Sequence, residues 1–381
     1  MKNLKEYLKS KPLYYKDIDY EKMPKIFSEI SSSFFLPKTV HIVGTNGKGS
    51  TGRYLTLMLE QNGFNVGHYT SPHILKFNER IYKNRENISD EELEILHIKL
   101  FKIVKKYEKN LSYFEYTTLL AFLAFQTCDF VVLEAGLGGE FDATNIVPKI
   151  LSIVTPISYD HQNFLGSNIA DIATTKINSI KNSAVIALQE FDEVYEVLKL
   201  YEKKIDKKFI YANENKIDEN LNNYALKHSL PNFLKQNLHT AHIALKELGF
   251  SVDFTGLPKL NLNGRHQKVL PNVMVDVGHN EAAARANLDE FKGKKIILIY
   301  NAYKDKDYRK ILDILSPIIL HVELIDMNDS ERENAKEEIK NYLDFLQIKH
   351  KEFKNIDKDR DYLVFGSFLV VEAFLKRCCG K

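Results

Sequence analysis

Cysteine is scarce in the sequence, and neither sign of charge is in excess. The 381 residues include three cysteines, of which only Cys378 and Cys379 stand close together. This number and spacing exclude a disulfide framework and a paired-cysteine metal site. The 53 basic and 51 acidic residues leave a formal net charge of +2, so no overall field draws the protein to nucleic acid or to an anionic membrane. An anionic ligand must therefore be bound by a local site.

A long hydrophobic run is also lacking. The most apolar stretch, residues 117–133, is interrupted by Gln126 and Asp129 and is shorter than the roughly 20 residues that a membrane-spanning helix needs. It fits better a buried helix over residues 116–127 followed by a strand. Residues 1–6 do not resemble the apolar core of a signal peptide. We therefore expect a cytoplasmic protein that binds neither membranes nor nucleic acid.

Short β-branched runs alternate with helical patterns along the chain. This alternation predicts an α/β fold in which helices cover both faces of a largely parallel sheet. The predicted strands are residues 39–43, 130–134, 150–155, 184–188, 272–276, 295–301, 321–326 and 362–365.

The length of the chain suits two α/β domains. A helical pattern over residues 237–248 is followed by Gly256 and Pro258, which are typical of a linker. We place the boundary at residue 257. This predicts a larger domain over residues 1–257 and a smaller, Rossmann-like α/β domain over residues 258–381.

The strongest motif is GTNGKGST at residues 44–51, between a predicted strand and a predicted helix. Glycines let backbone N–H groups turn toward phosphate oxygens, and the helix N-terminus adds partial positive charge. Lys48 would reach the phosphates of ATP, and Ser50 or Thr51 would approach a Mg²⁺ ion. The motif departs from G-x-x-x-x-G-K-[ST], because Gly49 follows the lysine. We interpret it as the loop of a P-loop ATPase domain; the plain alternative is a glycine turn.

Other polar residues follow predicted strands in the larger domain. Glu134 closes a buried strand and precedes a glycine-rich turn, at the edge where α/β sheets bind ligands. Together with Asp142, the pair Asp160-His161 and Lys176, it suits magnesium–phosphate chemistry. Segments 70–73 (TSPH) and 112–116 (SYFEY) are, by themselves, no more than a polar turn and a helix cap.

The smaller domain contributes two charged residues. Arg265 would neutralise charge that develops during phosphoryl transfer, although a surface ion pair is the plain alternative. Asp276 closes a predicted strand, where it would bind a ribose or a base.

In this order, the motifs resemble those of the folylpolyglutamate synthase/dihydrofolate synthase family, a branch of the Mur ligase superfamily. The resemblance runs from about residue 40 to Ser367 and rests on GTNGKGS, TSPH, FNERI, YFE, ExGLGG, DATN, DH, GRxQ, DxxHN and DKD. It implies an ATP-dependent amide ligase that joins L-glutamate to dihydropteroate, folate or both through an acyl phosphate. No general base for the glutamate amine is identified.

The resemblance also implies roles for individual residues. Those implied to bind ATP are Gly47, Lys48, Gly49, Ser50, Asn237 (at the adenine), Arg265 and Asp276. The implied ligands of two Mg²⁺ ions are Ser71, Glu134, His161 and Lys176, the last as a carbamate. The implied substrate-binding residues are Ser112, Tyr113, Phe114, Glu115, Phe141, Asp142 and Ala143. The implied catalytic set is Lys48, Lys176, His161 and Arg265.

Three positions depart from the family pattern. Glu140 stands where arginine is usual, Glu281 replaces a proline, and the family's EKAGI around Lys176 reads TKINS at residues 175–179. Two other functions remain open at this point: another Mur-type amino-acid ligase, and a switch ATPase that is not a ligase. The choice between the two synthase activities, the glutamate chain length and the oligomeric state, which we expect to be monomeric, are open as well.

Overall fold

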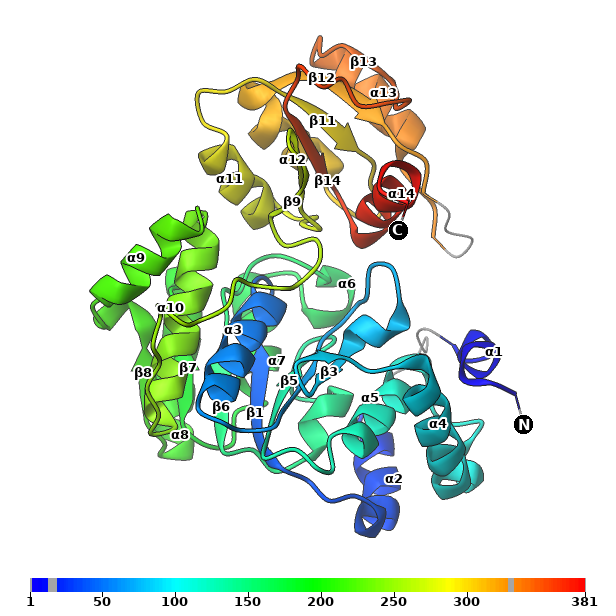
Figure 1. Cartoon of the computed structure of the whole chain (residues 1–381), viewed down its shortest axis with the longest axis vertical. Helices are drawn as coiled ribbons and strands as arrows, with labels where there is room; N and C mark the ends of the chain where they lie inside the picture. The colour runs from blue at the N-terminus through cyan, green and yellow to red at the C-terminus, as the bar shows by residue number, and fades with distance from the viewer. Residues whose placement is uncertain (1, 13–18, 328–331, 381) are drawn as a thin grey trace. The chain divides into compact units, whose positions relative to one another are not determined.

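The computed structural model describes residues 2–12, 19–327 and 332–380 of the chain, which forms two compact units (Figure 1). The first unit comprises Met1–His73, Phe77–Ser229 and Leu234–Leu260. The second comprises Ile74–Lys76, Leu230–Phe233 and Asn261–Lys381. The division into functional domains at residue 257 stays a prediction.

The first unit is built on an eight-stranded sheet in the order β4-β3-β2-β5-β1-β6-β7-β8. The six strands from β2 to β8 in this order are parallel, whereas β3 and β4 add an antiparallel edge. All carboxyl ends of the parallel strands therefore meet at one edge of the sheet, the place where α/β folds bind ligands. The strands are β1 (Lys38–Val43), β2 (Val66–Tyr69), β3 (Ile81–Lys83), β4 (Glu86–Asn87), β5 (Phe130–Glu134), β6 (Leu151–Val154), β7 (Ala184–Ile186) and β8 (Phe209–Tyr211).

Helices cover both faces of this sheet. On one face, Val43 and Val154 pack with α7 and α8, while Leu133 packs with α5. Helix α3 lies on the other face, because a Cβ on its Gly52 would contact Ile42, whose side chain points away from that of Val43. The helices are α1 (Leu4–Lys9), α2 (Lys22–Ile30), α3 (Lys48–Gln61), α4 (Asp90–Val104), α5 (Tyr113–Ala124), α6 (Gln162–Leu165), α7 (Ile169–Ile177), α8 (Asp192–Ile205), α9 (Glu219–Lys227) and α10 (Asn232–Glu247).

The second unit has a six-stranded sheet in the order β13-β12-β11-β14-β10-β9. Only β9 among these strands is antiparallel to its neighbour. The strands are β9 (Gln267–Leu270), β10 (Val273–Val275), β11 (Ile296–Tyr300), β12 (Ile319–Leu324), β13 (His350–Glu352) and β14 (Tyr362–Phe365). The helices are α11 (Glu281–Glu290), α12 (Tyr308–Leu315), α13 (Lys336–Phe345) and α14 (Phe368–Cys378).

The predicted α/β fold with two largely parallel sheets is confirmed. The strands predicted over residues 130–134 and 362–365 have the bounds of β5 and β14. The helix predicted over residues 116–127 is wrong by three residues at each end, since α5 runs from Tyr113 to Ala124. Its start is set by the cap at Ser112, which satisfies the first free amides of the helix.

Candidate active site

The glycine loop joins the end of β1 to the start of α3. Gly47 immediately precedes α3 with a φ of 82°, a left-handed conformation that glycine adopts without strain. A Cβ on Gly44 would overlap Oγ1 of Thr155. The N-terminal amides of α3 therefore follow a loop that requires glycine at these two positions, as expected of a phosphate-binding turn.

Two lysines converge on this loop. Lys48 Nζ donates to the carbonyl oxygens of Gly44 (3.2 Å) and Thr45 (3.1 Å), and Lys176 Nζ in α7 donates to the same Gly44 oxygen (3.0 Å). The Lys176 residue is only 5% exposed. Burial, and secondarily the charge of Lys48, lower the pKa of the Lys176 amine to about 7. About half of the amine is thus neutral at pH 7 and most of it at mildly alkaline pH, and the neutral amine is the state that carbamylation requires.

Asn237 in α10 lies against the same loop. Its Nδ2 donates to Oγ of Ser50 (2.8 Å), and Ser50 Oγ donates to the carbonyl of Gly47 (3.2 Å). A Cβ on Gly47 would lie 2.6 Å from Oδ1 of Asn237. Gly49 is buried in the first turn of α3. The predicted ATP-binding residues of the first unit are therefore brought together.

Glu134 is buried at the carboxyl end of β5. Its Oε2 accepts hydrogen bonds from the Thr70 hydroxyl and from the Ser71 backbone N–H (3.2 Å). The antiparallel pairing of β2 with β3 continues here, since Thr70 N–H donates to the Arg80 carbonyl (3.0 Å). The structure thus places the predicted metal ligands Ser71 and Glu134 side by side.

His161 lies in the turn between β6 and α6. Its φ of 54° is left-handed, and it caps the N-terminus of α6. Its backbone N–H donates to Oδ1 of Asp160 (2.9 Å), and its Nε2 lies 3.8 Å from Oδ2 of the same residue. With 46% of its side chain exposed, His161 is accessible to a ligand.

The polar side chains of residues 112–115 bond mainly to other groups of the protein. Glu115 Oε2 accepts from the backbone N–H (2.7 Å) and the hydroxyl (2.8 Å) of Ser112, which completes a capping box. Glu115 Oε1 pairs with Lys22 Nζ at 2.9 Å. Both carboxylate oxygens thus have partners inside the chain, and a contact of Glu115 with a substrate stays a prediction.

Aromatic residues surround this segment. The ring of Phe114 lies so close to Gly136 that a Cβ on Gly136 would be 2.5 Å from its Cζ. Tyr113 lies beside the guanidinium of Arg80, 5.3 Å from the ring centre. Phe141, which is 48% exposed, packs on Tyr20 with 4.1 Å between ring centres. Among these rings, Phe141 offers the most open apolar surface to a substrate.

Asp142 holds the glycine-rich turn after β5. Its Oδ2 accepts from the backbone N–H groups of Gly136 and Leu137, both at 2.9 Å. Its Oδ1 accepts from the backbone N–H (2.9 Å) and hydroxyl (2.6 Å) of Thr144. Burial raises the pKa of this carboxyl, while the four hydrogen bonds oppose the shift. The neighbouring Ala143 is buried, so these two residues shape the turn.

The remaining predicted nucleotide contacts belong to the second unit. Asp276 is buried after β10, and its oxygens accept from the backbone N–H groups of Gly278 (2.8 Å) and His266 (3.0 Å). Burial raises the pKa of Asp276, and these bonds and the charge of Arg265 oppose the rise. The Arg265 guanidinium lies 4.9 Å from the ring centre of Phe368. Contact of either residue with a nucleotide stays a prediction.

The first unit fits a divalent cation at the Ser71–Glu134 position. Hydroxyl and carboxylate oxygens are the hard ligands that Mg²⁺ prefers, and the Thr70 hydroxyl and the Ser71 backbone N–H lie beside the Glu134 carboxylate at the ends of β2 and β5. In the described part of the chain, no group of three or more His, Cys, Asp or Glu residues could hold a metal by itself. A carbamate on Lys176 would supply the additional oxygens.

Comparison with known proteins identifies the family. The chain is 31% identical over 368 residues to the dihydrofolate synthase/folylpolyglutamate synthase of Buchnera aphidicola subsp. Schizaphis graminum, covering 87% of this chain and 86% of the relative. The chain belongs to the dihydrofolate synthase/folylpolyglutamate synthase family. No protein-family model matches it.

Solved structures agree with this assignment. The folylpolyglutamate synthetase of Helicobacter pylori is 38% identical and superposes with a TM-score of 0.80, covering 99% of this chain and 98% of the other. The FolC protein of Escherichia coli in complex with DHPP and ADP is 25% identical, with a TM-score of 0.81 and coverage of 98% and 96%. The predicted resemblance to the dihydrofolate synthase/folylpolyglutamate synthase family is therefore confirmed.

Two of the departures from the pattern of the dihydrofolate synthase/folylpolyglutamate synthase family contact each other. Asn178 Nδ2 donates to Oε2 of Glu140 (2.8 Å), and the Glu140 backbone N–H donates to the Thr175 carbonyl (2.9 Å). The Glu140 carboxylate is thus hydrogen-bonded to the side-chain amide of Asn178. The two positions that depart from the family pattern therefore contact each other directly.

Sequence reasoning missed two residues of this site. Thr70, whose hydroxyl bonds Glu134, directly precedes the predicted ligand Ser71. Its hydroxyl at the end of a strand could have indicated a place in the site. Tyr20, which packs on Phe141, lies more than a hundred positions away in the sequence, and no local pattern connects the two.

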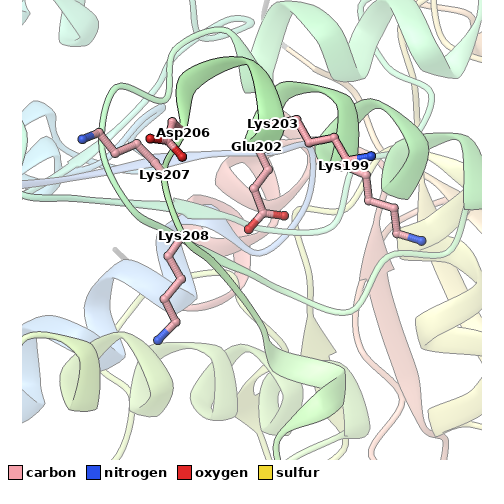
Figure 2. Close-up of a pocket in the computed structure, with 6 residues that line it drawn as sticks. All are labelled: Lys199, Glu202, Lys203, Asp206, Lys207 and Lys208. Carbon is pink, nitrogen blue, oxygen red and sulfur yellow. The ribbon is translucent and has the colours of Figure 1, made fainter.

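A solvent-exposed cavity of about 480 Å³ lies away from these residues (Figure 2). It is formed by the end of α8 and the residues before β8, at the amino ends of the parallel strands. The glycine loop follows the carboxyl end of β1, at the opposite edge of the sheet. The lining residues are Lys199, Glu202, Lys203, Asp206, Lys207 and Lys208, none of which belongs to the predicted site.

Proposed function

We propose that the protein is an ATP-dependent amide ligase that adds L-glutamate to dihydropteroate, to folate or to both. The observation that carries this proposal is the convergence of Lys48 and Lys176 on the Gly44 carbonyl, in a glycine loop at the end of β1, within a member of this family. The Escherichia coli relative that was solved with DHPP and ADP supports a site for both a pterin compound and a nucleotide.

The first step makes the acceptor carboxylate reactive. A carboxylate oxygen attacks the γ-phosphorus of ATP, the bond from that phosphorus to ADP breaks, and an acyl phosphate forms. Lys48 binds the phosphate oxygens and offsets their charge, and Arg265 adds positive charge where negative charge develops. A divalent cation held by Ser71, Glu134 and His161 would supply further positive charge to the phosphates.

The second step forms the product. The α-amine of glutamate attacks the acyl carbon, inorganic phosphate leaves, and the nitrogen loses a proton to give the amide. Exclusion of water protects the acyl phosphate from hydrolysis.

Magnesium is the proposed cation, bound by Ser71, Glu134 and His161. A second Mg²⁺ ion would need the carbamate of Lys176, which forms when the neutral amine adds CO₂ and releases a proton. The low pKa of Lys176 and its position at the glycine loop support this part of the proposal. Phe141 and Tyr113 are proposed to contact the acceptor.

The wider setting is also proposed. We propose a cytoplasmic monomer whose partners are its small-molecule substrates. Among the residues that the structure describes, no helix is long and apolar enough to cross a membrane.

Product analysis tests the function. Purified protein is incubated with ATP, Mg²⁺ and L-glutamate, together with either dihydropteroate or tetrahydrofolate, and products are identified by mass spectrometry. Formation of dihydrofolate, of a longer glutamyl folate or of both supports the proposal and separates the two activities. ATP turnover that ignores both acceptors would indicate a switch ATPase. Ligation only of other acceptors in an amino-acid ligase screen would indicate another Mur-type enzyme.

A further inference from the structure

Residues 155–158, which follow β6, hold the glycine loop in place. The Pro156 carbonyl accepts from the backbone N–H groups of Thr45 (2.9 Å) and Asn46 (3.1 Å). The Thr45 hydroxyl donates to the Ser158 carbonyl (3.0 Å) and accepts from the Ser158 N–H (3.1 Å). With the bond from Asn46 Nδ2 to Ser158 Oγ (3.3 Å), five hydrogen bonds join this segment to the first half of the loop, so its position sets the position of the loop.

On its β7 side, the described part of the chain places no strand beside this segment. The parallel pairing of β6 with β7 ends at Val154 and Ile186, and one further bond joins Ala187 N–H to the Val154 carbonyl (2.8 Å). Beyond this bond, the side chain of Gln189 supplies the hydrogen bonds that β7 no longer makes to the backbone of this segment. Its Oε1 accepts from Ile157 N–H (2.9 Å), and its Nε2 donates to the Thr155 carbonyl (3.4 Å).

This arrangement repeats the hydrogen bonding of a parallel strand. In a parallel ladder, one residue donates to and accepts from the two residues that flank its partner. Gln189 does the same to Thr155 and Ile157, on either side of Pro156, with its side-chain amide in place of a peptide group. The amide is buried and oriented, because Nε2 also donates to the Ala187 carbonyl (2.9 Å).

We infer that Gln189 is a positioning residue for the nucleotide site, an inference that rests on the proposed function. Gln189 contacts the segment of residues 155–158, and the segment contacts the glycine loop. The loop has little freedom to adapt, because a displacement of Thr155 toward Gly44 is blocked by their close approach. One side-chain amide therefore helps to orient the phosphate loop through residues 155–158.

Gln189→Met is the decisive variant. It keeps the length of the side chain but removes all three of its hydrogen bonds, which leaves the buried Ile157 N–H without its acceptor. We expect kcat/KM for ATP to fall about tenfold to a hundredfold, because misplacement of a binding loop by about 1 Å has effects of this size. KM for ATP should rise and the affinity for ADP, measured by calorimetry, should fall in parallel. The assays are made at a temperature at which circular dichroism shows the variant folded.

Gln61 provides a matched control in the same unit. Its Nε2 donates to the Asp253 carbonyl (2.8 Å) and its Oε1 accepts from the Asp253 N–H (2.8 Å). This side-chain amide also donates to and accepts from the backbone, but both bonds go to one residue and Gln61 is exposed, at the C-terminal end of α3. Gln61→Met should keep the wild-type kinetic constants for ATP. Equal constants for folded Gln189→Met and for wild type would overturn the inference, as would equal losses in the two variants.

A measurement on the wild-type protein covers the case in which Gln189→Met does not fold. Amide hydrogen exchange is compared with and without ADP. If Gln189, residues 155–158 and the loop act together, ADP should slow exchange at Ile157 along with Thr45 and Asn46. Slower exchange at Thr45 and Asn46 with no change at Ile157 would refute the inference. Wild-type protein that binds ADP but forms no amide product would refute the proposed function. In that case, the comparison of ADP binding between wild type and Gln189→Met would still test the positioning role of Gln189.

Discussion

The low pKa of Lys176 leads to a quantitative prediction about its reactivity. An unperturbed lysine has a pKa of about 10.4, so about 0.4% of its amine is neutral at pH 8. With a pKa of about 7, roughly nine tenths of the Lys176 amine is neutral at the same pH. The neutral fraction is therefore larger by about 200-fold. This factor is the upper limit of the gain in reactivity toward CO₂ or a neutral acylating reagent, because a less basic amine is a weaker nucleophile and Lys176 is buried.

The same shift makes stability depend on pH. The pKa of Lys176 is lower in the folded chain than in the unfolded chain, so folding releases a proton between about pH 7 and pH 10. The free energy of unfolding therefore rises with pH across this window, and the penalty for a charged, buried amine, on the order of 4 to 5 kcal/mol, is fully present below about pH 7.

Competitive acylation with mass spectrometry measures this pKa directly. Modification of Lys176 should reach its plateau near pH 8, and in Lys48→Met the midpoint should move upward, because the charge of Lys48 contributes to the shift. ¹³C-labelled bicarbonate should give a carbamate signal that Lys176→Ala lacks. A modification profile that still rises above pH 10 would refute the reasoning.

Three further predictions concern neighbouring residues. Lys48→Ala should lower kcat by about a hundredfold or more, because an interaction that strengthens in the transition state is lost, while thermal unfolding stays near that of wild type; near-normal turnover would remove the loop from the mechanism. Glu134→Gln should lower activity sharply, with partial recovery at raised Mg²⁺ but not at raised glutamate, and an unchanged Mg²⁺ dependence would leave Glu134 a structural residue. Gly136→Ala should destabilise the protein by about 1–3 kcal/mol through overpacking, because the new Cβ would lie 2.5 Å from the Phe114 ring; Phe114→Leu in the same chain should restore the melting temperature, and failure to do so would point to another cause.

Much of the fold was predictable because its central strands are continuous apolar runs. β5 and β14 are buried at every position, and their sequences contain no competing pattern. β2, Val66–Tyr69, was missed because its sequence includes a glycine and a histidine. Gly67 is required there because the ring of Phe125 fills the place of a Cβ. The polar strand β13 carries no apolar signal at all.

Parts of the site that one short segment forms were predictable from the sequence. Contacts between residues that are distant in the sequence were not. The glycine loop is local, and its glycines and lysine are adjacent in the sequence. The backbone amides that bond the carboxylates of Glu115 and Asp142 were not predicted, and contact of either residue with a substrate stays a prediction. The role of Gln189 depends on where β7 leaves β6, which a single sequence does not reveal.

The contact between Asn237 and Ser50 has a consequence for the order in which the protein matures on the ribosome. All eight strands of the first sheet are encoded before residue 212, whereas Asn237 follows in α10. A nascent chain can therefore complete this sheet while Ser50 still lacks the amide that bonds it. Because domains generally fold as units and Asn237 belongs to the same unit as the sheet, the nucleotide loop can be completed only after synthesis has passed α10.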